Sequence, residues 1–134
     1  MMSISDFFKK LGAELRNNRW SWGGIREDGS IVLRVWQDET IKRDGYLLAR
    51  LTYNDKFKDN PDNLGFRERN EHVGLIESGN TAILVMCKAE DPEQEPRNIA
   101  AFNRREVFTG SSIEKLDDDY WIRIDERIPV KSLI

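Results

Sequence analysis

Residues 81–88 read Thr-Ala-Ile-Leu-Val-Met-Cys-Lys, a continuous apolar run in a chain that is 34% charged. Strands with one covered face alternate between apolar and polar residues, whereas strands covered on both faces are apolar throughout. We therefore expect residues 81–88 to form the central strand of a sheet.

A hairpin is expected well before this run. Residues 20–26 and 31–36 are rich in aromatic and β-branched residues, and Asp28-Gly29 lies between them. Asp-Gly between two such runs is a strong hairpin signal. A second Asp-Gly, Asp44-Gly45, introduces an apolar and aromatic stretch over residues 46–53, which predicts a third strand.

More strands are expected after the central run. Ile99 and Phe102 mark a short, partly buried stretch. Residues 107–116 and 120–124 lie on either side of the acidic turn 117–119, and residues 120–124 alternate cleanly between two faces. These two segments are predicted to form another hairpin.

Two helices are predicted from apolar spacing and end signals. Residues 3–15 carry apolar side chains at helical spacing after Ser3, a plausible N-cap, and this helix is expected to end near Asn17-Asn18. Asp62 or Asn63 is expected to cap a second helix through residues 67–77, with Gly79 just past its end.

The predicted order is α-β-β-β-α-β-β-β, an α+β fold. Hairpins at both ends favour a strongly curved, mixed but mostly antiparallel sheet, or a small open barrel, with two flanking helices. The length of 134 residues suits a single domain over residues 1–134.

Composition and charge narrow the class of protein. No apolar run approaches the length that spans a bilayer, the N-terminus shows no leader pattern, and Cys87 has no second cysteine to pair with. These features predict a cytoplasmic protein without a membrane partner. The net charge of -3 argues against a protein that coats nucleic acid non-specifically.

Few residues are suited to catalysis. A single histidine, His72, and a single cysteine, Cys87, cannot build a Cys/His zinc site or an HNH nuclease centre. We expect His72 at the surface or boundary of its helix and Cys87 in the core. Asp38 and Glu39 are adjacent carboxylates that suit Mg²⁺, but adjacent acids are common in loops. The prediction is therefore a chain that is not an enzyme and that uses no cofactor or metal.

Tryptophan density is the most distinctive feature of the chain, which contains Trp20, Trp22, Trp36 and Trp121. One interpretation places these rings in the core of a small β-rich domain. The other places some of them around a pocket for a planar ligand such as a flipped base, held by stacking and by polar contacts to its edge. The residues predicted for that pocket are Trp20, Trp22, Arg34, Trp36, Asp38 and Glu39.

The strings around these tryptophans resemble a known family. Residues 19–23 (Arg-Trp-Ser-Trp-Gly) and 33–39 (Leu-Arg-Val-Trp-Gln-Asp-Glu) look like the opening of small bacterial domains found alone or fused ahead of HNH restriction endonucleases. Residues 65–69, 72–79, 87–91 and 128–130 are also similar. Such domains resemble the PUA-like group, which includes readers of modified cytosine. The resemblance implies a PUA-like fold and a role in restriction or defence, without cleavage because the HNH part is missing.

Two functions are favoured over a third, an enzyme that uses Asp38 and Glu39 with a metal. The first is a non-catalytic nucleic-acid-binding module that reads a modified or flipped base in DNA. Its pocket would be surrounded by a basic rim, for which the candidates are Arg19, Lys42, Arg43, Arg67, Arg104 and Arg105. The alternative is a regulatory or immunity-type protein that binds a basic protein partner through its acidic segments, residues 90–95 and 117–119.

Overall fold

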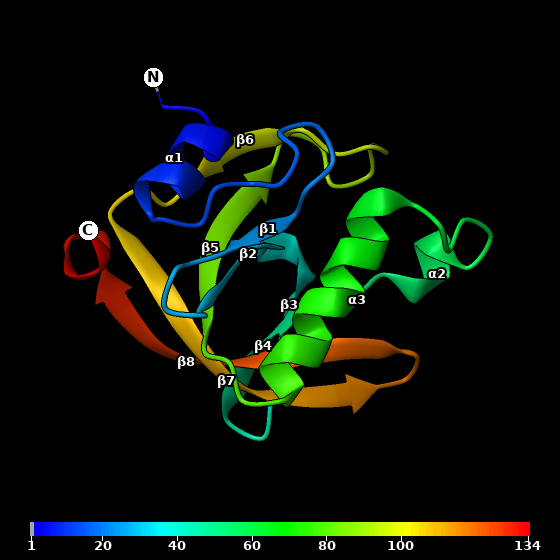
Figure 1. Cartoon of the computed structure of the whole chain (residues 1–134). Helices are drawn as coiled ribbons and strands as arrows, with labels where there is room; N and C mark the ends of the chain where they lie inside the picture. The colour runs from blue at the N-terminus through cyan, green and yellow to red at the C-terminus, as the bar shows by residue number, and fades with distance from the viewer. Residues whose placement is uncertain (1) are drawn as a thin grey trace.

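The computed structural model describes residues 2–134, which form a large sheet with helices on both of its faces (Figure 1). The helices are α1 (Ile4–Lys10), α2 (Asn54–Phe57) and α3 (Leu64–Glu77), and two 3-10 turns, η1 (Gln37–Glu39) and η2 (Val130–Leu133), follow strands. The strands are β1 (Gly23–Ile25), β2 (Ile31–Trp36), β3 (Thr40–Arg43), β4 (Tyr46–Arg50), β5 (Ala82–Ala89), β6 (Ile99–Phe102), β7 (Glu106–Leu116) and β8 (Asp119–Pro129).

The prediction of a central strand is confirmed by β5. It pairs with β2 on one edge and with β7 and β6 on the other. Its side chains alternate between two apolar clusters: Ala82 and Leu84 pack with Val73 and Ile76 of α3, whereas Ile83, Val85 and Cys87 belong to the cluster that contains Phe7 and Phe8 of α1. Both faces are covered, which explains why the run is apolar throughout.

The α+β class and the mixed, mostly antiparallel sheet are confirmed. The eight strands run in the order β1-β2-β5-β7-β8-β4-β3, with β6 also paired to β5. The β2–β5 pair is parallel and the other pairings of residues 2–134 are antiparallel. The sheet does not close into a barrel, so β1 and β3 are its edges.

The expected order of elements needs correction at several points. The opening helix ends at Lys10, well before Asn17, and the chain turns at Gly12 with a φ of +79°. Trp20 and Trp22 precede β1 instead of sharing a strand face within it. Additional elements are β3, which forms a hairpin with β4 across Asp44-Gly45, β6, over the stretch marked by Ile99 and Phe102, and α2, which lies between β4 and α3.

The start and end of α3 follow their sequence signals. The Asn63 side chain accepts a hydrogen bond from the Phe66 amide, as an N-cap does. Gly79, with a φ of +118°, follows the last turn. The helix packs on the sheet face opposite α1 and runs past the Trp20–Trp22 segment, which brings its first turn to the site described below (Figure 1).

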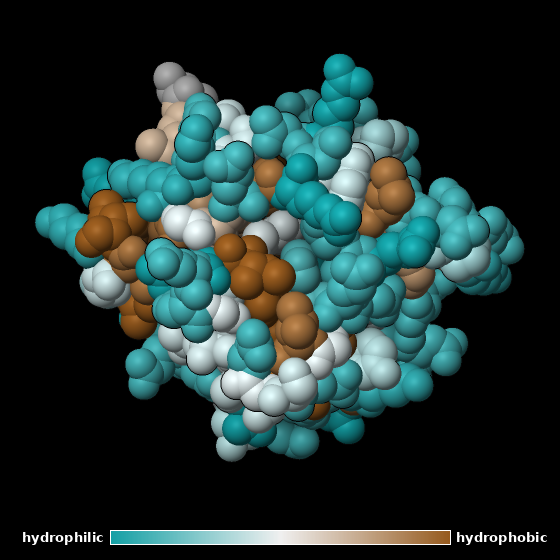
Figure 2. All heavy atoms as spheres, viewed as in Figure 1, coloured by the Kyte–Doolittle hydropathy of each residue, from teal (hydrophilic) through white to brown (hydrophobic). Residues whose placement is uncertain are grey.

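No helix within residues 2–134 combines the length and the apolar character needed to span a bilayer. The face that carries α3 is mainly hydrophilic, with apolar atoms gathered in separate patches (Figure 2).

Candidate functional site

A cavity of about 480 Å³ opens where the segment before β1, strand β2, helix α2 and the loop before β6 meet. Trp20, Trp22, Arg34 and Trp36, all predicted for a ligand pocket, line it together. The other lining residues are Arg19, Tyr53, Lys56, Phe57, Asn63, Arg69, Glu95, Pro96 and Arg97. Its volume lies within the range of sites that hold small planar ligands. We call it the aromatic pocket.

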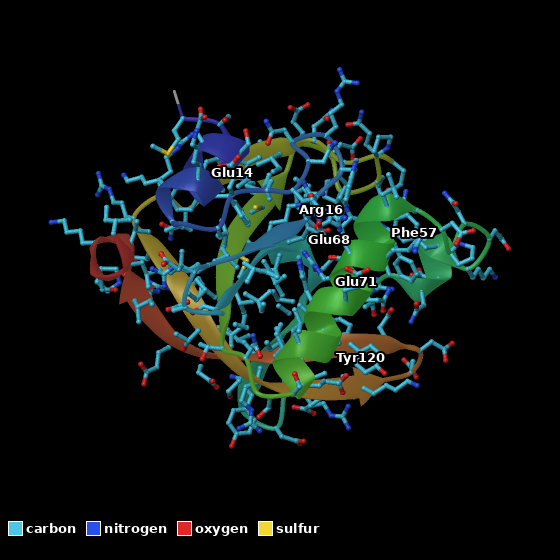
Figure 3. All side chains as sticks on the ribbon, in the orientation of Figure 1. Glu14, Arg16, Phe57, Glu68, Glu71 and Tyr120 are labelled. Atoms are coloured by element: carbon cyan, nitrogen blue, oxygen red, sulfur yellow. The ribbon has the colours of Figure 1, made fainter. Side chains whose placement is uncertain are left out.

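The walls of the aromatic pocket are rings packed against one another. The Trp22 ring meets the Tyr53 ring edge-on, with 6.1 Å between centroids, and lies 5.5 Å from Phe57. Phe57, which Figure 3 labels on α2 beside α3, stacks on Phe66 of α3 at 5.0 Å. Trp36 is only 7% exposed, whereas Trp20 and Trp22 are half-buried. These tryptophans therefore belong partly to the core and partly to a concave surface.

Trp22 can lie close to α3 because position 65 is a glycine. A Cβ atom at Gly65 would lie 2.5 Å from Trp22 Cε2 and 2.6 Å from the Trp20 carbonyl oxygen, and it would also meet Trp22 Nε1. Such distances are far inside van der Waals contact. Gly65 therefore fixes how deeply the Trp20–Trp22 segment sits against the helix.

Arg69 connects the segments that carry the rings. Its side chain is 2% exposed and donates hydrogen bonds to the carbonyl oxygens of Leu51 (2.9 Å), Trp22 (3.1 Å) and Arg34 (2.7 Å). Its guanidinium carbon also lies 5.4 Å from the centroid of the Trp22 ring. Burial lowers the pKa of Arg69 to about 10. One side chain of α3 thus holds the chain after β4, the segment before β1 and strand β2.

Among the cations that line the aromatic pocket, Arg34 is half-buried and lacks a partner. Its guanidinium lies 5.6 Å from the Trp36 ring centroid and lines the aromatic pocket. Within residues 2–134, no carboxylate lies within ion-pair distance of this guanidinium, and no group accepts a hydrogen bond from it. Burial lowers the pKa of Arg34. A half-buried charge without a counter-charge is unfavourable, so this side chain is prepared to receive an acceptor or an anion.

Asp38 and Glu39, predicted as pocket residues, are engaged by arginines instead of facing the cavity. Asp38 accepts two hydrogen bonds from Arg97, at 2.8 and 2.7 Å. Glu39 lies 3.5 Å from Arg97 and 3.2 Å from Arg50. The pairs hold the Arg97 guanidinium 5.2 Å from the Trp36 ring. The two acids therefore act on the pocket through Arg97.

Asp38 and Glu39 have no third side chain beside them that could complete a metal site within residues 2–134. No group of three or more His, Cys, Asp or Glu side chains in the part of the chain that the structure describes is arranged to hold a metal ion. Cys87 is fully buried, as predicted. Burial raises the pKa of its thiol to about 12, which keeps it protonated and unreactive at neutral pH.

The predicted basic rim does not gather at one place. Arg19 lines the aromatic pocket, but Lys42 and Arg43 lie on β3 beside another cavity, of about 650 Å³. Arg67 is exposed on α3 outside the pocket, Arg104 lies against Phe102, and Arg105 is exposed. The cations that do line the pocket with Arg19 and Arg34 are Lys56, Arg69 and Arg97. They come from distant parts of the chain, so no local sequence signal joins them to the tryptophans.

The acidic segments are partly used inside the fold. Asp119 is buried and accepts hydrogen bonds from Arg50 (2.6 and 2.9 Å), the Thr52 hydroxyl (3.0 Å) and the Asn54 amide (2.9 Å). Glu95 pairs with Lys56 at 2.5 Å. Fewer acids therefore remain free for a partner than the sequence indicates.

His72 is not at the surface, and the prediction for it is wrong. It is 5% exposed and faces the sheet beside Gly23, and Glu68, one turn earlier on α3, is also 5% exposed. Both side chains line a third cavity, of about 270 Å³, together with Glu14, Arg16 and Glu71. Figure 3 shows these three labelled residues and Glu68 where the segment after α1 meets α3. His72 Nδ1 and Glu68 Oε1 have no hydrogen-bond partner in residues 2–134.

We expect stability to fall as the pH falls from about 6.5 towards 4. Burial lowers the pKa of His72 from 6.5 to about 4. Between these pH values the His72 imidazole is protonated in the unfolded chain but stays neutral in the folded chain. The contribution of neutral His72 to the free energy of unfolding is fully present above pH 6.5. As the pH falls through this window, the free energy of unfolding decreases by on the order of 2–3 kcal/mol. Urea unfolding at a series of pH values measures it.

The matched variant for this titration is His72→Gln, since the chain has no other histidine. Its profile should be flatter between pH 6.5 and 4.5, whatever its absolute stability. Burial raises the pKa of Glu68. The contribution of protonated Glu68 to stability is therefore lost as the pH rises, which is opposite in sign to the effect of His72. Parallel profiles for the two proteins would contradict a buried, neutral His72.

The aromatic pocket thus combines ring walls, an unpaired arginine and a support that rests on α3. Comparisons with known proteins found no relative of this chain: no protein-family model, no curated protein and no solved structure matches it.

Proposed function

We propose that this domain is a non-catalytic nucleic-acid-binding module that receives one unstacked base in the aromatic pocket. The observation that carries the proposal is the unpaired Arg34 guanidinium within a cavity walled by Trp20, Trp22, Trp36 and Tyr53. Aromatic rings bind any base by its face, and each stacked base contributes about 1–3 kcal/mol. A pocket of about 480 Å³ suits a base that has left its duplex.

The finer form of the proposal is a PUA-like reader of a modified or flipped base in a restriction or defence context. It rests on the resemblance of residues 19–23 and 33–39 to that group. The position of these two strings supports it, because they supply three tryptophans and two arginines, Arg19 and Arg34, to one cavity.

The alternative proposal, a regulatory or immunity-type protein that binds a basic partner, has less support. It requires free acids at residues 90–95 and 117–119, and two of these, Glu95 and Asp119, already have cationic partners. Co-purification with a basic protein, lost when the remaining acids of residues 90–95 are neutralised, would favour it.

Replacing Trp20 with Ala is expected to weaken DNA binding roughly tenfold, because the base loses one stacking surface. The probe is a short duplex with one base facing an abasic site, so that this base leaves the stack easily. Fluorescence anisotropy at low salt measures the affinity. Trp20 is suited to this test because it is half-buried and outside the strands.

The control is Trp121→Ala, which removes the tryptophan that lines the separate cavity beside β3. It should bind as the wild type does, and circular dichroism should show that both variants are folded. The proposal fails if no duplex or single strand, modified or plain, binds the wild-type protein at low salt. It also fails if Trp20→Ala binds as tightly as the wild type.

A further inference from the structure

The polar side chains of the aromatic pocket are mainly hydrogen-bond donors. Five of them are cationic: Arg19, Arg34, Lys56, Arg69 and Arg97. The side-chain acceptors on the same walls are few and partly used, since Glu95 Oε1 pairs with Lys56 and the side-chain carbonyl oxygen of Asn63 accepts from the Phe66 amide. A ligand edge that offers donors would find few side-chain partners there.

Most of the donors are also engaged, which isolates Arg34. Arg69 is directed to three main-chain carbonyls, Arg97 to Asp38, and Lys56 to Glu95. The Arg19 side chain is exposed at the mouth of the cavity. Arg34 is half-buried on β2, beside Trp36 and without a partner. Other unpaired groups lie in the same walls, because the Tyr53 hydroxyl and the Nε atoms of Arg69 and Arg97 are buried and make no hydrogen bond within residues 2–134.

The chemistry of a guanidinium decides which edge fits. Arginine carries five N–H donors in a planar fork and no acceptor, so it binds two adjacent acceptors at once. Guanine presents two adjacent acceptors, O6 and N7, on one edge. Adenine places a donor at N6 next to N7, and cytosine presents a donor at N4. Stacking on the rings of the pocket would not distinguish these bases, but the bond to Arg34 would.

We infer that the aromatic pocket selects a planar base with two adjacent acceptors on one edge, guanine being the unmodified case, and that Arg34 reads this edge. The inference rests on the proposed function and adds the chemical class of the base. A cytosine with a carboxylate at C5 belongs to the same class, because a carboxylate also offers two acceptors and adds the missing counter-charge.

The test measures binding of free deoxynucleoside monophosphates and of the same bases facing an abasic site in one duplex. We expect guanine and hypoxanthine, which share O6 and N7, to bind within twofold of each other and roughly tenfold more tightly than adenine. Replacing N7 with carbon, in 7-deazaguanine, should remove most of this advantage. Carboxylated cytosine should bind more tightly than cytosine.

Two substitutions at position 34 sharpen the test. Glutamine binds the N6 and N7 pair of adenine, so Arg34→Gln should shift the preference from guanine to adenine. Arg34→Lys keeps the charge without the fork and should bind, with less discrimination. Arg127→Gln is the matched control, because Arg127 is an exposed arginine of β8 outside the pocket. Thermal unfolding should show that all three variants are folded.

Each outcome separates this inference from the proposed function. DNA that binds through the pocket with equal affinity for every base would overturn the inference and leave the function standing. Guanine nucleotides that bind while no DNA does would support the inference and overturn the function. If neither nucleotides nor DNA bind, both are overturned.

Discussion

Replacing Arg69 with Met is expected to lower the free energy of unfolding by roughly 2–4 kcal/mol, because each buried carbonyl that loses its donor costs about 1–3 kcal/mol. Met keeps an unbranched side chain in the same space but donates no hydrogen bond. The carbonyl oxygens of Leu51, Trp22 and Arg34 all lose this donor at once. Urea unfolding monitored by tryptophan fluorescence gives the value.

One effect works against this loss. A charge buried away from water is itself unfavourable, which lowers the pKa of Arg69 to about 10, and Met removes that charge. The loss should still dominate because Trp22 and Arg34 belong to segments that meet at this side chain, and Trp22 also has its ring beside the guanidinium.

Arg67→Met provides the comparison for this substitution. Arg67 lies on the same helix but is exposed, so its replacement should change the stability by no more than about 0.5 kcal/mol. Equal effects of the two substitutions would show that the bonds of Arg69 contribute nothing specific. Under the proposed function, the Arg69→Met protein should also lose DNA binding, since position 69 no longer holds both walls of the aromatic pocket.

Replacing Gly65 with Ala should destabilise the protein by roughly 1–3 kcal/mol or more, the usual cost of overpacking. The new methyl group would overlap the indole of Trp22 and the carbonyl oxygen of Trp20, and one of these contacts is main chain, which cannot move by rotating a side chain. Trp22 must then shift away from α3. We expect a changed tryptophan emission together with a lower urea midpoint.

The same helix offers a control for this substitution. Gly74 lies on the exposed face of α3, and a Cβ atom there would have no neighbour within 4 Å. Gly74→Ala should stabilise the protein by about 0.5–1 kcal/mol, because alanine is the better helix former. If the two substitutions change the stability by the same amount, helix propensity alone would explain both changes. That result would contradict the close approach of Trp22 to Gly65.

The parts of the fold that the sequence predicts are those set by local patterns. The run at residues 81–88 is apolar because both of its faces are covered, and Asp28-Gly29 gives a hairpin because its backbone suits the turn. Strand β3 could not be predicted because it is an edge strand in which Ile41, Lys42 and Arg43 are exposed. Its sequence therefore has no alternation of apolar and polar residues.

The misplacement of His72 has a similar cause. Helix α3 turns Glu68, Arg69 and His72 towards the protein, so polar residues occupy part of its buried face. Apolar periodicity cannot identify such a face. What stabilises Arg69 is a set of carbonyl oxygens far away in the sequence, and only the folded chain shows that they converge.

The tryptophans of the candidate site were predictable from the sequence, but the other residues that line it were not. Trp20, Trp22, Arg34 and Trp36 lie within one short region, and a hairpin brings its two halves together. Tyr53, Phe57 and Arg97 come from elsewhere, and nothing in their own surroundings marks them. The roles of Asp38 and Glu39 were also hidden, because their partner Arg97 lies far along the chain.

The bonds of Arg69 have a consequence for how this domain can diverge. They end on main-chain oxygens, which every amino acid supplies, so the support does not depend on which side chains the supported segments carry. Mutations at Arg34 or Trp20 can therefore change the lining of the cavity while its backbone frame persists. A frame that tolerates such exchanges offers a practical starting point for the laboratory selection of cavities with a different chemistry.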